Sequence, residues 1–370
     1  MLLTVRRIFA LFCVGLLATA LIYPYSLDAQ TNSRGGSPLP SEEQFRVPVD
    51  STGLRVFLRH LPGAKRGVGR TRAPVLFIHG ATFPSALAAG FKFDGTSWMD
   101  DLSREGFDVW ALDFLGYGNS DRYPEMRDLP FAHPPLGRAD EAARQIAAAV
   151  SFITAHQRVT RISLIAHSWG TIPTGLYAGR HPERIERLVQ FGPVAQRVGA
   201  PDTTKVPAYG LVTEEAQRTR FYGYVPQGES PVLDPRHFAE WGPAYLGSDS
   251  TARTRVPASV AVPNGPGADI NDAWSGHLHY DPGVITAPVL IVRGEWDKVT
   301  RDADARWLYD ALTHSPLKRD VKISHATHVM HLEASRYQLY RETVTFLAGG
   351  DIPGEAVAPL PAPHGKSGDH

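Results

Sequence analysis

Short apolar runs rich in β-branched residues alternate along this chain with longer segments of helical periodicity. Continuous apolar runs are typical of strands buried on both faces, and such strands separated by helices indicate a parallel sheet. The runs that predict strands are 47–49, 54–59, 74–79, 107–113, 162–167, 188–191, 288–293 and 321–324. The clearest helical segments are 140–156, 171–180, 302–312 and 332–347. We expect an α/β fold with helices on both faces of a mostly parallel, eight-stranded sheet, whose first two strands form an antiparallel hairpin.

The regular alternation stops between residues 195 and 285. This stretch is rich in Pro, Gly and aromatic residues and has no run that resembles a central strand. It lies between two predicted sheet strands, and open α/β sheets bind ligands beyond the carboxyl ends of their strands. Structureless loops of this length are rare in compact domains. We therefore expect a lid or cap at 195–285, inserted between core segments 44–194 and 286–349.

The two ends of the chain differ in composition from this core. Arg6 and Arg7 precede an apolar run over 8–22, which is the pattern of a secretory signal, here expected over 1–29. The alternative is an uncleaved membrane anchor, although the run is short for a bilayer span. Segments 30–43 and 350–370 predict a flexible linker and a disordered tail. We expect an exported protein, periplasmic or extracellular, without a stable membrane span after cleavage.

Charge and cysteine content narrow the function. The chain has 38 basic and 38 acidic residues, mixed along the sequence, so no basic stripe indicates a nucleic-acid partner. The only cysteine, Cys13, lies in the predicted signal. A mature chain without cysteine excludes a cysteine nucleophile and a thiolate metal site. The oligomeric state is not predicted.

Ser168 directly follows the apolar run 162–166 and precedes a helical pattern. Small residues, Ala166 and Gly170, stand two positions away on either side. A serine at a sharp strand-to-helix turn needs small neighbours, and it projects its hydroxyl over the start of a helix. The consensus has Gly where this chain has Ala166. The alternative is an ordinary turn in which the serine caps the helix.

A serine hydroxyl becomes a nucleophile when an imidazole accepts its proton and a carboxylate orients that imidazole. Asp297 and His328 each follow a later predicted strand, so the order is serine, acid, histidine. Glu295 is the competing acid. The spacing of His325, His328 and His331 could also suggest a metal, but the three would not face one point and no carboxylate completes the set. We therefore predict Ser168, Asp297 and His328 as the catalytic residues, with no metal and no cofactor.

Five motifs in order resemble the α/β-hydrolase fold family, in its serine esterase and lipase branch. They are His79-Gly80-Ala81, the Asp113–Ser120 segment (Asp-x-x-Gly-x-Gly-x-Ser), the Ser168 turn, Gly294–Asp297, and Thr327-His328 followed by His331-Leu332-Glu333. The resemblance covers about 45–348. It implies Asp297 as the acid and Ala81 as one backbone N–H donor of an oxyanion hole. The N–H of Trp169, next to the nucleophile, would be the other donor.

The predicted reaction is hydrolysis of a carboxylic ester or lactone through an acyl-enzyme on Ser168. Carbon–carbon bond hydrolases and cofactor-free oxygenases share the scaffold and stay open as alternatives. Amidase or peptidase activity is less favoured, because His79-Gly80-Ala81 departs from the glycine-rich turn of proline iminopeptidases. A small-molecule ester with an apolar or aromatic part is the expected substrate. The residues predicted to line its pocket are Phe83, Trp169, Phe221, Tyr222 and Trp241, and each could equally be a core residue.

Overall fold

The computed structural model of the chain describes residues 39–50, 53–64, 72–200 and 203–349. The predicted signal (1–29), most of the predicted linker (30–38) and the predicted tail (350–370) lie outside the described residues. No helix in the described part of the chain is long and apolar enough to cross a bilayer.

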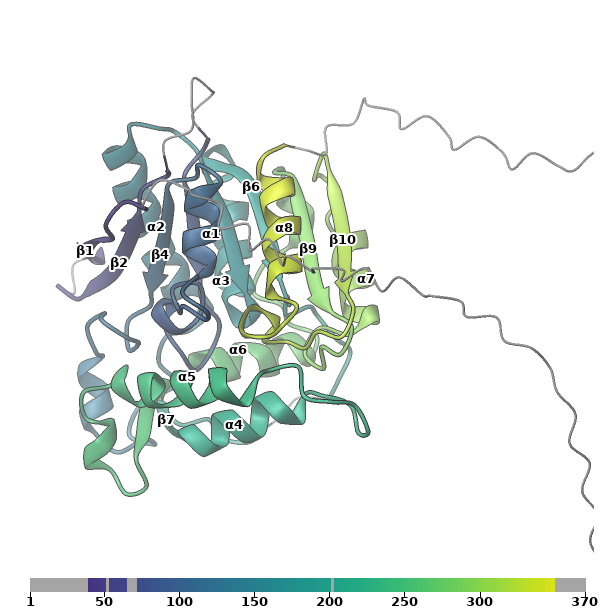
Figure 1. Cartoon of the computed structure of the whole chain (residues 1–370). Helices are drawn as coiled ribbons and strands as arrows, with labels where there is room; N and C mark the ends of the chain where they lie inside the picture. Colours follow the sequence, from purple (N-terminus) through teal and green to yellow (C-terminus); the bar gives the residue numbers. More distant parts are fainter. Residues whose placement is uncertain (1–38, 51–52, 65–71, 201–202, 350–370) are drawn as a thin grey trace, which may run out of the picture. The chain divides into compact units, whose positions relative to one another are not determined.

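The central element is an eight-stranded sheet with the spatial order β1-β2-β4-β3-β5-β6-β9-β10 (Figure 1). Only β2 runs against its neighbours, and every other adjacent pair outside it is parallel. The bounds are β1 (Glu43–Pro48), β2 (Arg55–Leu61), β3 (Val75–Ile78), β4 (Val109–Asp113), β5 (Ile162–His167), β6 (Ile185–Phe191), β9 (Val289–Gly294) and β10 (Lys318–Ile323). The predicted mostly parallel, eight-stranded α/β fold is confirmed.

Helices cover both faces of the sheet. Helices α1 (Trp98–Arg104) and α8 (Arg336–Leu347) pack together on one face, whereas α2 (Ala139–Gln157) and α3 (Thr171–Arg180) pack together on the other (Figure 1). Helix α7 (Asp302–Ala311) packs beside β10. With both faces covered, strands β3, β4 and β5 are buried along their whole length. This explains why they appear in the sequence as continuous apolar runs.

Local sequence explains the helices that flank the site. On α2 the buried residues include Ala142, Ile146, Val150 and Ile153, which recur at the spacing of one helix face. Helix α1 begins with a capping box in which Ser97 and Asp100 exchange side-chain and backbone hydrogen bonds. Our sequence reading did not assign α1, although the Ser97-x-x-Asp100 spacing signals such a start.

Between β6 and β9 the chain leaves the large sheet for a segment that we call the insertion (residues 192–288, described except for 201–202). It contains helices α4 (Glu214–Gly223), α5 (Pro235–Gly247) and α6 (Gly265–Trp274), and an antiparallel pair of strands, β7 (Tyr209–Thr213) and β8 (Ser259–Pro263). In Figure 1 these helices lie together across one end of the large sheet. The indole of Trp241 in α5 donates to the Leu87 carbonyl, 2.9 Å away, and joins the insertion to the loop after β3.

Several predicted boundaries were wrong by a few residues. Strand β6 begins three residues before the predicted 188, because the exposed Glu186 and half-buried Arg187 interrupt the apolar run after the buried Ile185. Strand β10 begins three residues before 321, because its first three residues are polar and exposed or half-buried. The last helix begins at Arg336 rather than at 332, since the chain first makes a short 3-10 turn over Met330–Leu332.

Candidate active site

Ser168 stands at the end of β5 in a backbone conformation that side chains rarely adopt. Its φ is +57°, in the left-handed region, and the 3-10 turn Ser168–Gly170 leads directly into α3. A Cβ on Gly170 would lie 2.4 Å from the His79 carbonyl oxygen, and a Cβ on Gly80 would lie 2.8 Å from the Ser168 Cβ. Both positions therefore require glycine, and the turn after β3 is pressed against the serine.

The structure brings Ser168, His328 and Asp297 into one hydrogen-bonded line. The Ser168 Oγ lies 2.8 Å from the His328 Nε2. The His328 Nδ1 lies 2.9 Å from Asp297 Oδ2 and 3.1 Å from Oδ1. In the tautomer that fits these contacts, Nδ1 carries the proton and donates a hydrogen bond to the carboxylate. Nε2 is then unprotonated, and its lone pair faces the serine hydroxyl. All three residues are buried. This arrangement can remove the serine proton and stabilise the imidazolium that forms.

Backbone groups hold the acid and the histidine in place. Asp297 Oδ1 accepts the N–H groups of Val299 at 2.8 Å and Thr300 at 2.9 Å. The His328 carbonyl accepts a hydrogen bond from the Nε2 of His167, 2.9 Å away, which links the histidine loop to the strand that carries Ser168. His167 thus orients the site without touching the serine hydroxyl.

The turn after β3 is organised by His79. Its Nδ1 donates to the Gly80 carbonyl at 2.6 Å and its Nε2 accepts the Phe114 N–H at 3.1 Å, so both ring nitrogens are used. Asp113 accepts the N–H groups of Ser85 and Asn119 at 2.9 and 3.1 Å. Both side chains therefore stabilise loops, and the turn that they stabilise carries Ala81 beside Ser168.

The indole of Trp169 is hydrogen-bonded to helix α6 of the insertion. The ring is buried, and Nε1 donates to Asp269 Oδ2 in α6 at 2.9 Å. The other Asp269 oxygen accepts from the Arg138 guanidinium. Asp269 is completely buried, so this pair of bonds ties the residue after Ser168 to the insertion.

The other predicted pocket residues form an aromatic cluster between the insertion and the sheet. The Phe83 ring meets the rings of Trp241 and Phe221 edge-on at 5.4 and 6.0 Å. These three side chains are buried, whereas Tyr222 is half-buried and packs on Phe238. Whether the cluster lines a substrate pocket stays a prediction.

Burial shifts the pKa of three further groups near the triad. It lowers the pKa of His167 well below its ordinary value and that of His331 to about 3, so both imidazoles are neutral. It also raises the pKa of Glu333 to about 7, although Thr327 donates two hydrogen bonds to that carboxylate. Neither ring nitrogen of His331 has a hydrogen-bond partner among the described residues.

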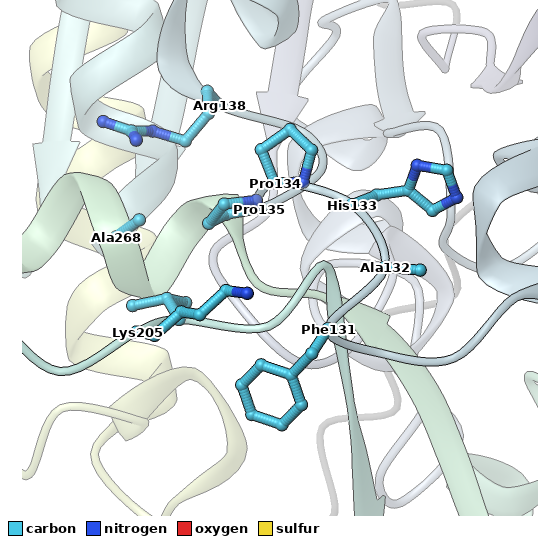
Figure 2. A pocket seen from close by; sticks show the side chains of 9 residues that line it. Phe131, Ala132, His133, Pro134, Pro135, Arg138, Lys205 and Ala268 are labelled. Carbon is cyan, nitrogen blue, oxygen red and sulfur yellow. The ribbon is translucent and has the colours of Figure 1, made fainter.

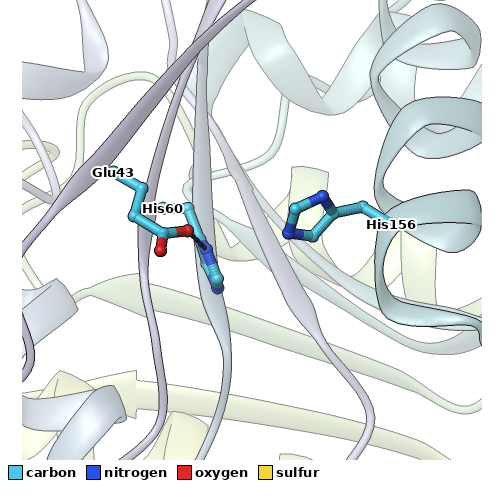
Figure 3. Close-up of side chains that lie close together, drawn as sticks. All are labelled: Glu43, His60 and His156. Atoms are coloured by element: carbon cyan, nitrogen blue, oxygen red, sulfur yellow. Dashed lines mark hydrogen bonds and ion pairs between the residues drawn. The ribbon is translucent and has the colours of Figure 1, made fainter.

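Two other features lie away from this site. Figure 2 shows a surface groove of about 460 Å³ that Phe131, His133 and Arg138 help to line, and no triad residue borders it. The second is the group Glu43, His60 and His156, drawn in Figure 3.

In the described part of the chain, two groups have donor atoms close enough to share an ion. In the first, Glu43 and Asp108 lie 2.9 and 3.2 Å from the two ring nitrogens of His60, so both nitrogens are already engaged. In the second, Asp269, Asp272 and His279, the Arg138 guanidinium already contacts all three side chains. Neither arrangement requires a metal.

A family model described as alpha/beta hydrolase fold matches residues 73–335. The chain belongs to the α/β-hydrolase fold family. The match includes the insertion and most of both core segments, and it spans every motif from His79 to Glu333. A sequence comparison with curated proteins gave no match.

Solved structures of this fold are similar over most of the chain. A serine hydrolase from the polyaromatic-hydrocarbon-degrading bacterium Cycloclasticus zankles is 16% identical, with a TM-score of 0.55 over 84% of this chain and 99% of that one. A thermophilic esterase is 18% identical, with a TM-score of 0.52 over 84% and 98%. A bromoperoxidase from Bacillus anthracis is 16% identical, with a TM-score of 0.56 over 83% and 100%. At such identity the likeness establishes the fold.

Sequence reasoning missed the polar residues that the insertion directs at the core. Asp269 is 100 positions from Trp169 in the chain, and Arg220 is 138 positions from Thr82, to which it donates. Neither residue stands in a motif. The only local signals were the caps of the helices that carry or precede them, such as Thr213 before α4.

Proposed function

We propose that this α/β hydrolase cleaves a carboxylic ester or lactone through an acyl-enzyme on Ser168. The observation that carries the proposal is the buried line from Ser168 Oγ through His328 to Asp297, with distances of 2.8 and 2.9 Å. Hydrogen bonds of this length in this order are what a serine nucleophile needs.

In the first step His328 Nε2 takes the serine proton while Oγ bonds to the ester carbonyl carbon. The carbonyl electron pair moves to oxygen, where the backbone N–H groups of Ala81 and Trp169 are the proposed donors. The tetrahedral intermediate then expels the alkoxide, which takes the proton from His328. The position of Gly80 against Ser168 supports this placement of the donors.

In the second step water replaces the alcohol. His328 accepts a proton from the water as its oxygen attacks the acyl carbon, and the ester bond to Ser168 breaks. Oγ recovers the proton, and the acid leaves. Asp297 keeps its charge throughout and stabilises the imidazolium in both steps.

The insertion is the proposed lid over this site, and its aromatic cluster is the proposed wall for an apolar or aromatic part of the substrate. The residues are Phe83, Phe221, Tyr222 and Trp241, whereas the ring of Trp169 contacts Phe114 instead. Its position across the sheet end, joined to the loop after β3 by Trp241, supports that role. We also propose export to the periplasm or the medium, from the charged and apolar pattern over 1–29.

The test compares wild type with Ser168→Ala on short p-nitrophenyl esters and lactones. We expect kcat to fall by about 10⁴- to 10⁶-fold, since triad members act as a unit. Ser151→Ala, at an exposed serine on α2, is the matched control and should keep wild-type turnover. A fluorophosphonate should label the protein at one site, which mass mapping places at Ser168. Full turnover in Ser168→Ala would overturn the proposal and favour an oxygenase, which need not use the serine.

A further inference from the structure

Arg220 in α4 directs a guanidinium toward the turn that carries Ala81. Its Nη2 donates to the Thr82 Oγ1 at 2.9 Å. The Nε is closed off from solvent and has no acceptor among the described residues. The Nη1 also makes no hydrogen bond to a described residue, but unlike Nε it is accessible to solvent. Of the five N–H groups of this guanidinium, therefore, only one donates a hydrogen bond to a described residue, and its acceptor is a hydroxyl.

No carboxylate in the described part of the chain lies within 4 Å of this charge. Its electrostatic neighbours include the phenols of Tyr117, Tyr224 and Tyr245 and the neutral imidazole of His167, and burial lowers its pKa from the usual value. A guanidinium nevertheless stays protonated in proteins. Arg122 likewise forms no ion pair with a carboxylate in the described part of the chain. Unlike Arg220, however, it donates hydrogen bonds to three backbone carbonyl oxygens. The Arg220 side chain is half-buried, and its guanidinium lies over the Phe221 ring, 5.1 Å from the centroid, but neither supplies a negative charge. A cation partly withdrawn from water without an anion is costly to the fold.

A role in attaching α4 to the turn does not explain why the chain keeps a charged side chain at position 220. Gln217, one turn earlier on α4, donates its Nε2 to the same Thr82 Oγ1 at 3.0 Å. That neutral side chain already provides the connection between helix and turn. The positive charge of Arg220 adds nothing to the connection that an uncharged donor would not add. A charge kept under these conditions indicates a charged partner that arrives from outside the chain.

Arg220 lies at the same end of the sheet as the triad. Thr82 directly follows Ala81, and its φ of +80° turns it into the loop pressed against Ser168. On the other side, the Tyr224 ring lies 5.9 Å from the His328 ring and is close enough to Arg220 for the charge to act on its hydroxyl. The guanidinium therefore stands between the proposed oxyanion donor and a side chain that touches the histidine.

We propose that Arg220 binds a carboxylate of the substrate, so that the ester cleaved at Ser168 carries a negative charge a few bonds from its scissile carbonyl. A half-ester of a dicarboxylic acid has this chemistry. The open Nη1 is the donor offered to the anion, and a charge-assisted hydrogen bond is about twice as strong as a neutral one. This inference rests on the proposed function, since it names the substrate class of the same site.

The experiment compares two esters of equal chain length, 4-nitrophenyl hydrogen glutarate and 4-nitrophenyl valerate. The wild type should have the higher kcat/KM on the glutarate ester. In Arg220→Gln the glutarate-to-valerate ratio should fall on the order of a hundredfold, because the anion loses its cationic hydrogen-bond donor at a half-buried position. Arg220→Lys keeps the positive charge but loses the planar set of N–H donors that matches a carboxylate, so it should give an intermediate ratio. Arg218→Gln, at an exposed arginine on the same helix, is the matched control and should not change the ratio.

A second arm tests binding without turnover. Free glutarate should raise the Tm of Ser168→Ala, and glutaramide, its neutral analogue, should not. Adding Arg220→Gln to Ser168→Ala should abolish the shift, and Arg220→Lys keeps the arm interpretable if the Gln variant does not fold. An unchanged ester ratio in Arg220→Gln, or an equal glutarate shift with and without Arg220, overturns the inference while esterase activity stands. Loss of the proposed function is seen separately, as absent fluorophosphonate labelling of Ser168.

Discussion

The buried carboxyl of Glu333 makes the stability of the histidine loop depend on pH. Burial and the nearby charge of Asp297 raise its pKa to about 7, against the two hydrogen bonds from Thr327, whereas an unfolded glutamate titrates near 4.5. Each pH unit between these values is worth about 1.4 kcal/mol, and the interval is about 2.5 units. The carboxyl therefore contributes about 3 kcal/mol less to folding at pH 8 than below pH 4.5.

The folded protein favours the protonated form of Glu333, and this determines the direction in which stability changes with pH. Stability from Glu333 is fully present below pH 4.5 and is lost as pH rises through about 7. Glu333→Gln resembles the protonated acid, because the amide oxygen can accept from the Thr327 N–H and the amide nitrogen can donate to Thr327 Oγ1. We expect the variant to gain about 3 kcal/mol over wild type between pH 4.5 and pH 8.

Urea unfolding at a series of pH values measures this difference directly. Other titrating groups are common to both proteins, so their contributions cancel in the comparison. Glu215→Gln, at an exposed glutamate of α4, should follow wild type at every pH. A constant difference between Glu333→Gln and wild type across this range would refute the reasoning, and so would a difference that shrinks as pH rises.

Two further predictions concern buried polar groups beside the triad. Asp269→Ala should lower the unfolding free energy by about 2 kcal/mol, because the Trp169 indole and the Arg138 guanidinium lose a charged acceptor, and it should also lower kcat on esters. Asp269→Asn should recover most of the kcat because its amide oxygen still accepts from the indole; equal kcat in wild type and Asp269→Ala would contradict this. His331→Leu should match or exceed wild-type stability at pH 7, since no hydrogen bond is lost. Between pH 6.5 and pH 4 the stability of His331→Leu relative to wild type should grow by about 3 kcal/mol, because His331 has a pKa of about 3 and stays neutral in the fold while the unfolded chain gains the proton. Urea unfolding that shows no such growth would contradict this prediction.

How much the sequence could predict depended on the range of the interaction. The Ser168 turn was predictable because its requirements are local, namely an apolar strand before it and small residues around it. His328 and the acid loop followed from their places after successive strands, and the family resemblance selected Asp297 over Glu295 within that loop. Arg220 and Asp269 could not be predicted, because each gains its meaning from a partner more than 90 positions away in the chain. The helices of the insertion escaped notice because no regular alternation frames them, although Asp234 before Pro235 marks the start of α5.

The insertion leaves the sheet after Phe191 and returns at Val289, and these two residues belong to neighbouring, hydrogen-bonded strands. The two strands are parallel, and Val289 lies opposite Leu188 rather than Phe191, so the chain leaves at the carboxyl end of β6 and crosses back to the amino end of β9. Such a segment behaves as an exchangeable module if its replacement makes the same crossover, since the strand order and the three reacting side chains then stay in place. Substrate choice could thus evolve by exchange of this one segment while the chemistry is inherited unchanged. Any replacement would have to bring its own acceptor for the Trp169 indole.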